Sequence, residues 1–176
     1  MRKVIVALLS MLIWSGSAVA ACVGTITAST PTADFIDHAD GTVTHSKSGL
    51  MWKQCSEGLT TTTTACDTGA ATLHTWQAAL QLAETLNAGA GFAGHTDWRV
   101  PNQKELNSIV ERQCVTPAIN ATIFPATVSG WYWSASPYAG VATSAWVVGF
   151  SSGLGDANFK TLNNYVRLVR GGEWIT

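Results

Sequence analysis

Four cysteines constrain the fold of this chain more strongly than any other feature of its sequence. Cys22, Cys55, Cys66 and Cys114 form an even set, which in an oxidising compartment predicts two disulfides. Three pairings are possible, and the sequence alone does not choose among them. We favour Cys55–Cys66, which closes a short loop around a threonine-rich run, with Cys22–Cys114 tying down the N-terminal arm. Each bridge would remove entropy from the unfolded chain and contribute ~2–4 kcal/mol.

Residues 1–20 are typical of a secretory signal peptide, which would carry the chain into such a compartment. Arg2 and Lys3 precede an uncharged, mostly apolar run, and small residues fill positions 18–20 before the expected cleavage site. This run is shorter than the roughly 20 apolar residues of a membrane-spanning helix, and no later stretch is long enough. We therefore predict an extracytoplasmic protein, in the periplasm, at the cell surface or secreted, without a membrane span.

A lipoprotein processing site is the alternative at this position. Residues 19–22 end in Cys22, which would become the lipidated first residue, but the leucine usual three positions earlier is absent. Lipidation would also leave an odd thiol among the remaining cysteines. We favour cleavage without lipidation.

The charge of the exported chain argues against nucleic acid as a partner. Loss of residues 1–20 removes two cations and leaves eight Lys and Arg against eleven Asp and Glu, a net charge of −3. Duplex binding depends on a basic face that releases counterions. The remaining 156 residues suffice for one domain with its own core, which we place at 34–176 after an extended arm at 21–33.

The first half of the domain contains strand and helix signals. Turn residues precede two short strands expected at 42–45 and 50–53. Apolar residues then recur at three-to-four spacing from Trp76 to about Asn87, with Thr75 as the N-cap and glycines at 89 and 91 as the end of a helix.

A capping-box pattern, with Asn102 followed three residues later by Glu105, begins a second helix. Short strands follow at 131–134, 145–150 and 165–170, and residues 151–160 are expected to form a polar, turn-rich loop between two of them. Two helices followed by antiparallel strands indicate an α+β domain.

Aromatic residues are the main candidates for a binding site, although most tryptophans should pack in the core. We expect core positions for Trp52, Trp76 and Trp98, and exposure of one of Trp131 and Trp133, because alternate residues of a strand face opposite sides. Loops on rigid scaffolds often carry binding. The predicted ligand-binding residues are Trp131, Trp133, Tyr138, Asp156, Asn158 and Lys160.

No pattern in the sequence predicts an enzyme, a metal or a cofactor. The histidines lack paired ligand spacing, and the acidic residues at 34, 37 and 40 do not fit the calcium loop of helix-loop-helix proteins. Asp97 and Arg99 are expected to hold a loop by hydrogen bonds. An unrecognised enzyme is the alternative, and it would most plausibly use His95 with Asp97.

Four segments in fixed order carry a family resemblance: GLMW at 49–52, DWRVPNQKEL at 97–106, WYWSAS at 131–136 and YVRLVRGG at 165–172. Over roughly residues 34–172 the chain resembles the Lcl C-terminal domain family, a domain of unknown function. It is more distantly similar to the formylglycine-generating-enzyme/sulfatase-modifying group. That similarity implies a C-type-lectin-like fold, with two helices packed on short antiparallel strands and long loops. The catalytic cysteines of that group have no counterpart after Cys114.

The resemblance also implies a function. The founding member of the family is the C-terminal region of a collagen-like adhesin associated with sulfated glycosaminoglycans. We therefore expect a non-enzymatic module that binds glycans or another cell-surface component. The net charge argues against sulfated polymers unless Lys53, Arg112, Arg167 and Arg170 cluster. The alternative is a structural or protein-interaction module that binds another envelope protein.

Overall fold

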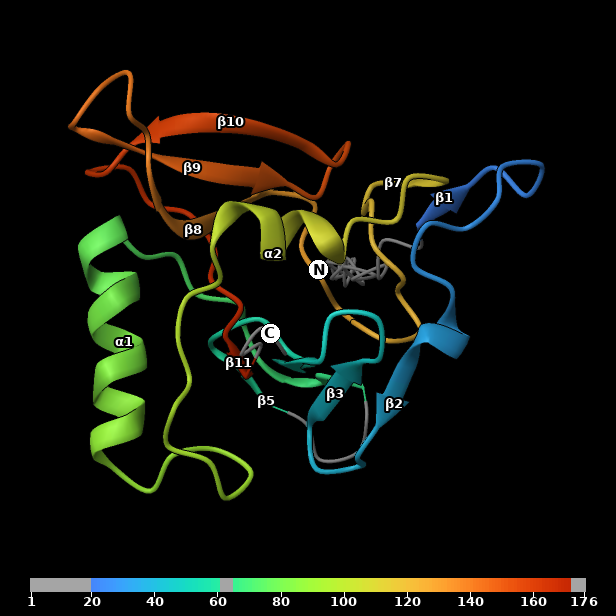
Figure 1. Cartoon of the computed structure of the whole chain (residues 1–176), viewed down its shortest axis with the longest axis horizontal. Coiled ribbons are helices and arrows are strands. Elements are labelled where there is room, and N and C mark those ends of the chain that lie inside the picture. The colour runs from blue at the N-terminus through green and yellow to red at the C-terminus, as the bar shows by residue number, and fades with distance from the viewer. Residues whose placement is uncertain (1–19, 61–64, 172–176) are drawn as a thin grey trace, which may run out of the picture.

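The computed structural model describes residues 20–60 and 65–171, so residues 1–19 of the predicted signal peptide 1–20 lie outside this part of the chain. The architecture is α+β, as predicted, with two helices and several small antiparallel sheets (Figure 1). The elements are β1 (Ala21–Cys22), a 3-10 turn (Thr32–Asp34), β2 (Phe35–Asp37), β3 (Thr42–His45), β4 (Leu50–Lys53), β5 (Leu59–Thr60), β6 (Thr68–Gly69), α1 (Trp76–Ala88), α2 (Gln103–Ser108), β7 (Cys114–Val115), β8 (Trp131–Pro137), β9 (Ser144–Gly149), β10 (Leu154–Phe159) and β11 (Val169–Gly171).

A four-stranded antiparallel sheet has the order β11-β4-β3-β2. Strands β3 and β4 coincide with the two strands predicted at 42–45 and 50–53. The turn between them needs Gly49, whose φ of +66° lies in the left-handed region that favours glycine. Strand β11 pairs with β4, so a segment near the end of the described chain completes a sheet begun near its start.

A three-stranded antiparallel sheet has the order β10-β9-β8. Its edge strand corrects the prediction of a loop at 151–160, since Leu154–Phe159 pairs along its whole length with β9. The sequence LGDANF contains no β-branched residue and little alternation, so its own propensity gave no strand signal. Its pairing with the apolar strand β9 makes it a strand.

The strand predicted at 165–170 is also corrected, because only Val169–Gly171 forms a named strand. The preceding residues instead bond to both sheets. The carbonyl of Tyr165 accepts from Trp133 in β8, whereas the carbonyl of Leu168 accepts from Lys53 in β4. This segment therefore connects the two sheets, and residues 166–169 are buried on both sides.

Both helices begin where their caps predict. The Thr75 side chain accepts a hydrogen bond from Ala78 N at the start of α1, and Gly89 is the C-cap. At α2, Asn102 accepts from Glu105 N while the Glu105 carboxylate accepts from Asn102 N, which completes the predicted capping box.

The core has two parts, and strand β9 contributes to both. Val148 packs with Trp52 and with Leu106 of α2 on one side, while Val147 packs with Trp98 and α1 on the other. Burial of Trp52 and Trp98 is as predicted, and Trp76 is half-buried against the second part. Because both faces of β9 are covered, the sheet of β8, β9 and β10 meets solvent mainly at β10 and at its two ends.

Both favoured disulfides are present, Cys22–Cys114 and Cys55–Cys66. The first joins β1 to β7 and holds the predicted arm against the domain, as its two strands also pair. Within the described residues, no helix is long and apolar enough to cross a membrane. The C-type-lectin-like fold remains a prediction.

Candidate functional site

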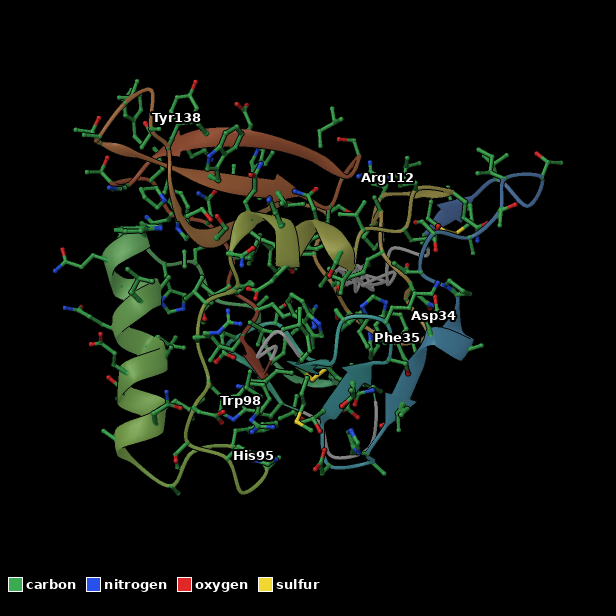
Figure 2. All side chains as sticks on the ribbon, viewed as in Figure 1. Asp34, Phe35, His95, Trp98, Arg112 and Tyr138 are labelled. Atoms are coloured by element: carbon green, nitrogen blue, oxygen red, sulfur yellow. A yellow bond between two sulfur atoms is a disulfide. The ribbon has the colours of Figure 1, made fainter. Side chains whose placement is uncertain are left out.

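The six predicted ligand-binding residues do not gather in one place (Figure 2 shows the side chains on the ribbon). Trp133 is fully buried, and its indole N–H donates to the His74 carbonyl at 2.7 Å. The prediction that Trp133 contacts a ligand is corrected accordingly, because its side chain belongs to the core. Of the two tryptophans, Trp131 is the exposed one, with 36% of its surface accessible.

Trp131 lies at the beginning of β8, in one row across the sheet with Gly149 of β9 and Leu154 of β10. A Cβ on Gly149 would lie 2.8 Å from Cζ3 of Trp131, so the indole rests directly on the glycine backbone. Leu154 extends the row and is 63% exposed. Asp156 lies on the same face, two residues along β10. We call Trp131, Gly149, Leu154 and Asp156 the Trp131 surface.

Asp156 and Asn158 both bond within the domain. One Asp156 carboxylate oxygen accepts from the following backbone N–H, of Ala157, at 2.8 Å, and the side chain is exposed. The Asn158 amide donates to the Asn164 side-chain oxygen at 3.4 Å. Asp156 therefore keeps its second oxygen at the Trp131 surface, whereas Asn158 contributes to the packing of the segment after β10.

Tyr138 and Lys160 lie at the other end of the sheet. The Tyr138 ring packs edge-on against Trp146, with 5.1 Å between centroids. The Lys160 ammonium donates to the Ala142 carbonyl at 2.8 Å and lies 4.4 Å from the centre of the Trp76 ring. These contacts stabilise the hairpin between β8 and β9 and separate both residues from Trp131.

Two exposed apolar residues escaped the sequence analysis. Leu154 and Phe159, 59% exposed, are the ends of β10, and the interpretation of 151–160 as a polar loop concealed them. A period-of-two pattern within the segment would have placed Leu154 with Asp156 and Phe159 on the opposite face, but only after the strand itself had been recognised.

The basic residues named as a possible cluster are mostly engaged inside the fold. Arg167 is fully buried, and Lys53 is buried in an ion pair with Glu57 at 2.7 Å. Arg170 binds Asp97 through two nitrogens, at 2.7 and 3.2 Å. Only Arg112 of the four is exposed. They do not form the surface patch that a sulfated polymer would require.

Asp97 and Arg99 have the structural role that the sequence predicts. The Arg99 guanidinium binds both carboxylate oxygens of Glu105 at 2.7 Å, and Arg170 binds both oxygens of Asp97. The Arg170 hydrogen bond lowers the pKa of Asp97. Burial alone would raise the pKa of Glu105, but hydrogen bonds from Arg99 and from the Asn102 backbone outweigh it and lower that pKa.

Three histidines and the N-terminal acids bind neighbouring protein groups. His45 contacts the Ser48 hydroxyl at 2.9 Å, and His74 the Thr72 hydroxyl at 2.8 Å. Asp40 accepts from the backbone and hydroxyl of Thr42, as in the Asp-held turn that the sequence favours. Among residues 20–60 and 65–171, no three His, Cys, Asp or Glu side chains lie close enough to hold a metal ion.

A family model, the Lcl C-terminal domain, matches residues 41–170. The match spans every strand from β3 to β10, both helices and most of β11. No curated protein matches the chain. The distant similarity to the formylglycine-generating-enzyme group stays a prediction. On the family match, which covers well over half of its length, the chain belongs to the Lcl C-terminal domain family.

Proposed function

We propose that this protein is an exported, non-enzymatic binding module that recognises an uncharged glycan of a cell surface through the Trp131 surface. The observation that carries the proposal is the position of Trp131, whose indole rests on Gly149 and keeps 36% of its surface exposed. An aromatic ring held flat by the backbone beneath it is preorganised, so little side-chain entropy is lost when a ligand packs on it.

The neighbours of Trp131 suit a sugar. Leu154 extends the apolar surface, and the second carboxylate oxygen of Asp156 can accept hydrogen bonds from hydroxyl groups. A sugar ring presents apolar C–H groups on its faces and hydroxyls around its edge, which matches this pairing. The net charge of −3 and the engagement of Arg167 and Arg170 inside the fold favour an uncharged ligand over a sulfated one.

The partners of the acidic residues support a non-enzymatic role. Asp97 is bound by Arg170 and Glu105 by Arg99, and both pKa values are lowered, so neither carboxylate is prepared to accept a proton near neutral pH. The two disulfides support an extracytoplasmic location, because such bridges persist in oxidising compartments.

A protein partner is the second candidate, and the exposed apolar residues around β10 favour it. Leu154, Phe159 and Leu162 expose roughly half or more of their surfaces. Exposed apolar side chains at and beside an edge strand favour a protein partner. A second envelope protein could therefore bind here in place of a glycan.

A glycan-array screen of the purified, oxidised protein tests the proposal. We expect saturable binding to uncharged glycans, with or without calcium, and a loss of more than about tenfold for Trp131→Ala. Phe159→Ala is the matched control, because it removes another exposed aromatic ring, on the opposite face of the same sheet. Equal binding by both variants, or binding confined to sulfated glycans, would contradict the proposal. If no glycan on the array binds, the protein partner is favoured.

A further inference from the structure

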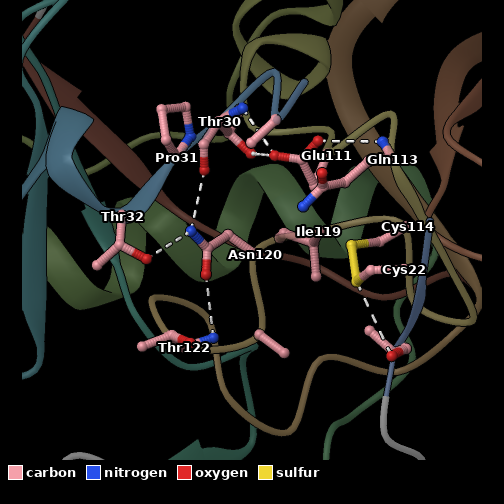
Figure 3. A pocket seen from close by; sticks show the side chains of 13 residues that line it. Cys22, Thr30, Pro31, Thr32, Glu111, Gln113, Cys114, Ile119, Asn120 and Thr122 are labelled. Carbon is pink, nitrogen blue, oxygen red and sulfur yellow. Dashed lines mark hydrogen bonds between the residues drawn. A yellow bond between two sulfur atoms is a disulfide. The ribbon is translucent and has the colours of Figure 1, made fainter. Parts of the chain in front are cut away.

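An open cavity of about 430 Å³ lies between the N-terminal arm and the loop at 111–122, and it shares no lining residue with the Trp131 surface (Figure 3). The arm contributes Ala28 and residues 30–32, and the Cys22–Cys114 bridge contributes one wall. This volume falls within the range of sites that hold small molecules. None of the residues predicted from the sequence to bind a ligand lines it.

The cavity is preformed, because two polar side chains of the loop hold the arm in place. The Glu111 carboxylate accepts from the backbone and hydroxyl of both Ser29 and Thr30, at 2.8–3.0 Å, and from Gln113 N at 3.1 Å. The Asn120 amide donates to the Thr30 carbonyl at 2.9 Å and to the Thr32 hydroxyl at 3.1 Å. Together with the disulfide, these bonds fix both walls before any ligand enters.

The electrostatics of the cavity select against cations. Glu111 is the single charged side chain among those that line it, and it is buried. Burial opposes its ionisation, but hydrogen bonds from the backbones of Ser29, Gln113 and Thr30 outweigh burial and lower its pKa. Glu111 is therefore anionic but saturated by protein donors. A cation would find no free carboxylate there.

The other polar groups that line the cavity are hydroxyls and side-chain amides, and they lie beside apolar side chains. Thr122 bonds to Asn120 through its backbone N–H and keeps its hydroxyl available. Gln113 uses its backbone N–H for Glu111 and also lines the cavity. Pro31 and Ala121, which are half-buried and exposed respectively, supply apolar surface. This combination suits a small, uncharged ligand with both hydroxyl or amide groups and apolar C–H surface.

We propose that this cavity is a second binding site, separate from the Trp131 surface, for a single uncharged sugar residue bearing hydroxyl and amide groups. The sugar packs its C–H face against Pro31 and Ala121 and exchanges hydrogen bonds with Thr122 and Gln113. This site does not depend on the proposed role of Trp131, since the two surfaces share no residue.

The test is a titration of the oxidised protein with the methyl glycoside of N-acetylglucosamine, followed by two-dimensional amide NMR. We expect saturable shifts confined to the arm and to the loop at 111–122. Thr122→Val should weaken binding about fivefold, since it removes one hydroxyl. Ala121→Phe should abolish binding by filling the cavity. Thr85→Val and Ala88→Phe, on the exposed side of α1, are matched controls that should bind as the native protein does.

The outcomes distinguish this site from the proposed function. Shifts that survive Ala121→Phe, shifts confined to the Trp131 surface, or no saturable shift at the highest soluble concentration would overturn the second site. Trp131→Ala should leave these shifts unchanged, so a failure of either proposal can be recognised without the other.

Discussion

Replacement of Arg167 should be among the most destabilising changes in this domain. Its guanidinium is fully buried and donates to the carbonyls of Lys53 and Gln54 and to the hydroxyls of Ser56, at 3.3 Å, and Thr127, at 2.7 Å. Burial lowers the pKa of Arg167 to about 10, which still leaves it protonated at neutral pH. The guanidinium therefore satisfies four acceptors from two parts of the chain, residues 53–56 and Thr127.

The cost of Arg167→Met follows from which of these acceptors lose their partner. Ser56 keeps its contact with the Tyr132 hydroxyl, and Thr127 keeps its own bond to the Phe124 carbonyl. The two carbonyls released by Arg167 are buried, and each unsatisfied carbonyl costs ~1–3 kcal/mol. We therefore expect the free energy of unfolding to fall by about 2–6 kcal/mol. In a domain of this size, each kcal/mol lowers the Tm by about 2–4 °C.

Urea unfolding of the oxidised protein, followed by tryptophan fluorescence, measures this loss. Arg167→Lys should cost at least as much, because a single ammonium cannot reach all four acceptors and is more strongly hydrated than a guanidinium. Arg170→Met is the control, since it removes a more exposed ion pair with Asp97 that should contribute less than about 1 kcal/mol. An Arg167→Met protein within about 1 kcal/mol of the native one would refute the reasoning.

Two further predictions concern other buried polar groups. Burial lowers the pKa of His45 below 6.5, while Asp34 raises it and Lys47 lowers it, so the unfolded chain binds the proton more tightly. The free energy of unfolding should therefore fall as the pH drops below 6.5, by at most about 1.4 kcal/mol per pH unit. Urea titrations at a series of pH values measure this slope, and His45→Gln should remove it. The same slope in both proteins would contradict this prediction. Glu111→Gln replaces one acceptor oxygen by an NH₂ group, so the backbone amides of Ser29 and Thr30 should exchange at least about tenfold faster in hydrogen-exchange NMR. Helix α1 should stay protected. Unchanged exchange at Ser29 and Thr30 would count against an arm held by Glu111.

The features that the sequence predicted well are those decided by neighbouring residues. The Thr75 cap, the capping box of Asn102 with Glu105, and the hairpin around Gly49 each involve residues within a few positions of one another. Their geometry follows from side chains whose partners are already adjacent in the sequence.

The features that escaped prediction depend on distant partners. Strand β10 forms because β9 lies beside it, and Trp133 is buried because His74 and the segment after β10 cover it. The cavity was invisible for the same reason, since Ser29 and Glu111 are 82 positions apart. Local propensity and spacing cannot reveal a cavity that lies between two segments so far apart in the sequence.

The position of β11 has a consequence for how the domain acquires its structure. Strand β4 pairs with β3 as soon as both exist, but its other edge is open until Val169 reaches Trp52. A chain that emerges with its N-terminal end first, from a ribosome or through a membrane, thus presents the unpaired edge of β4 until β11 follows. The sheet closes only when residues 169–171 arrive, long after β3 and β4 have been made, so maturation of this domain waits for β11.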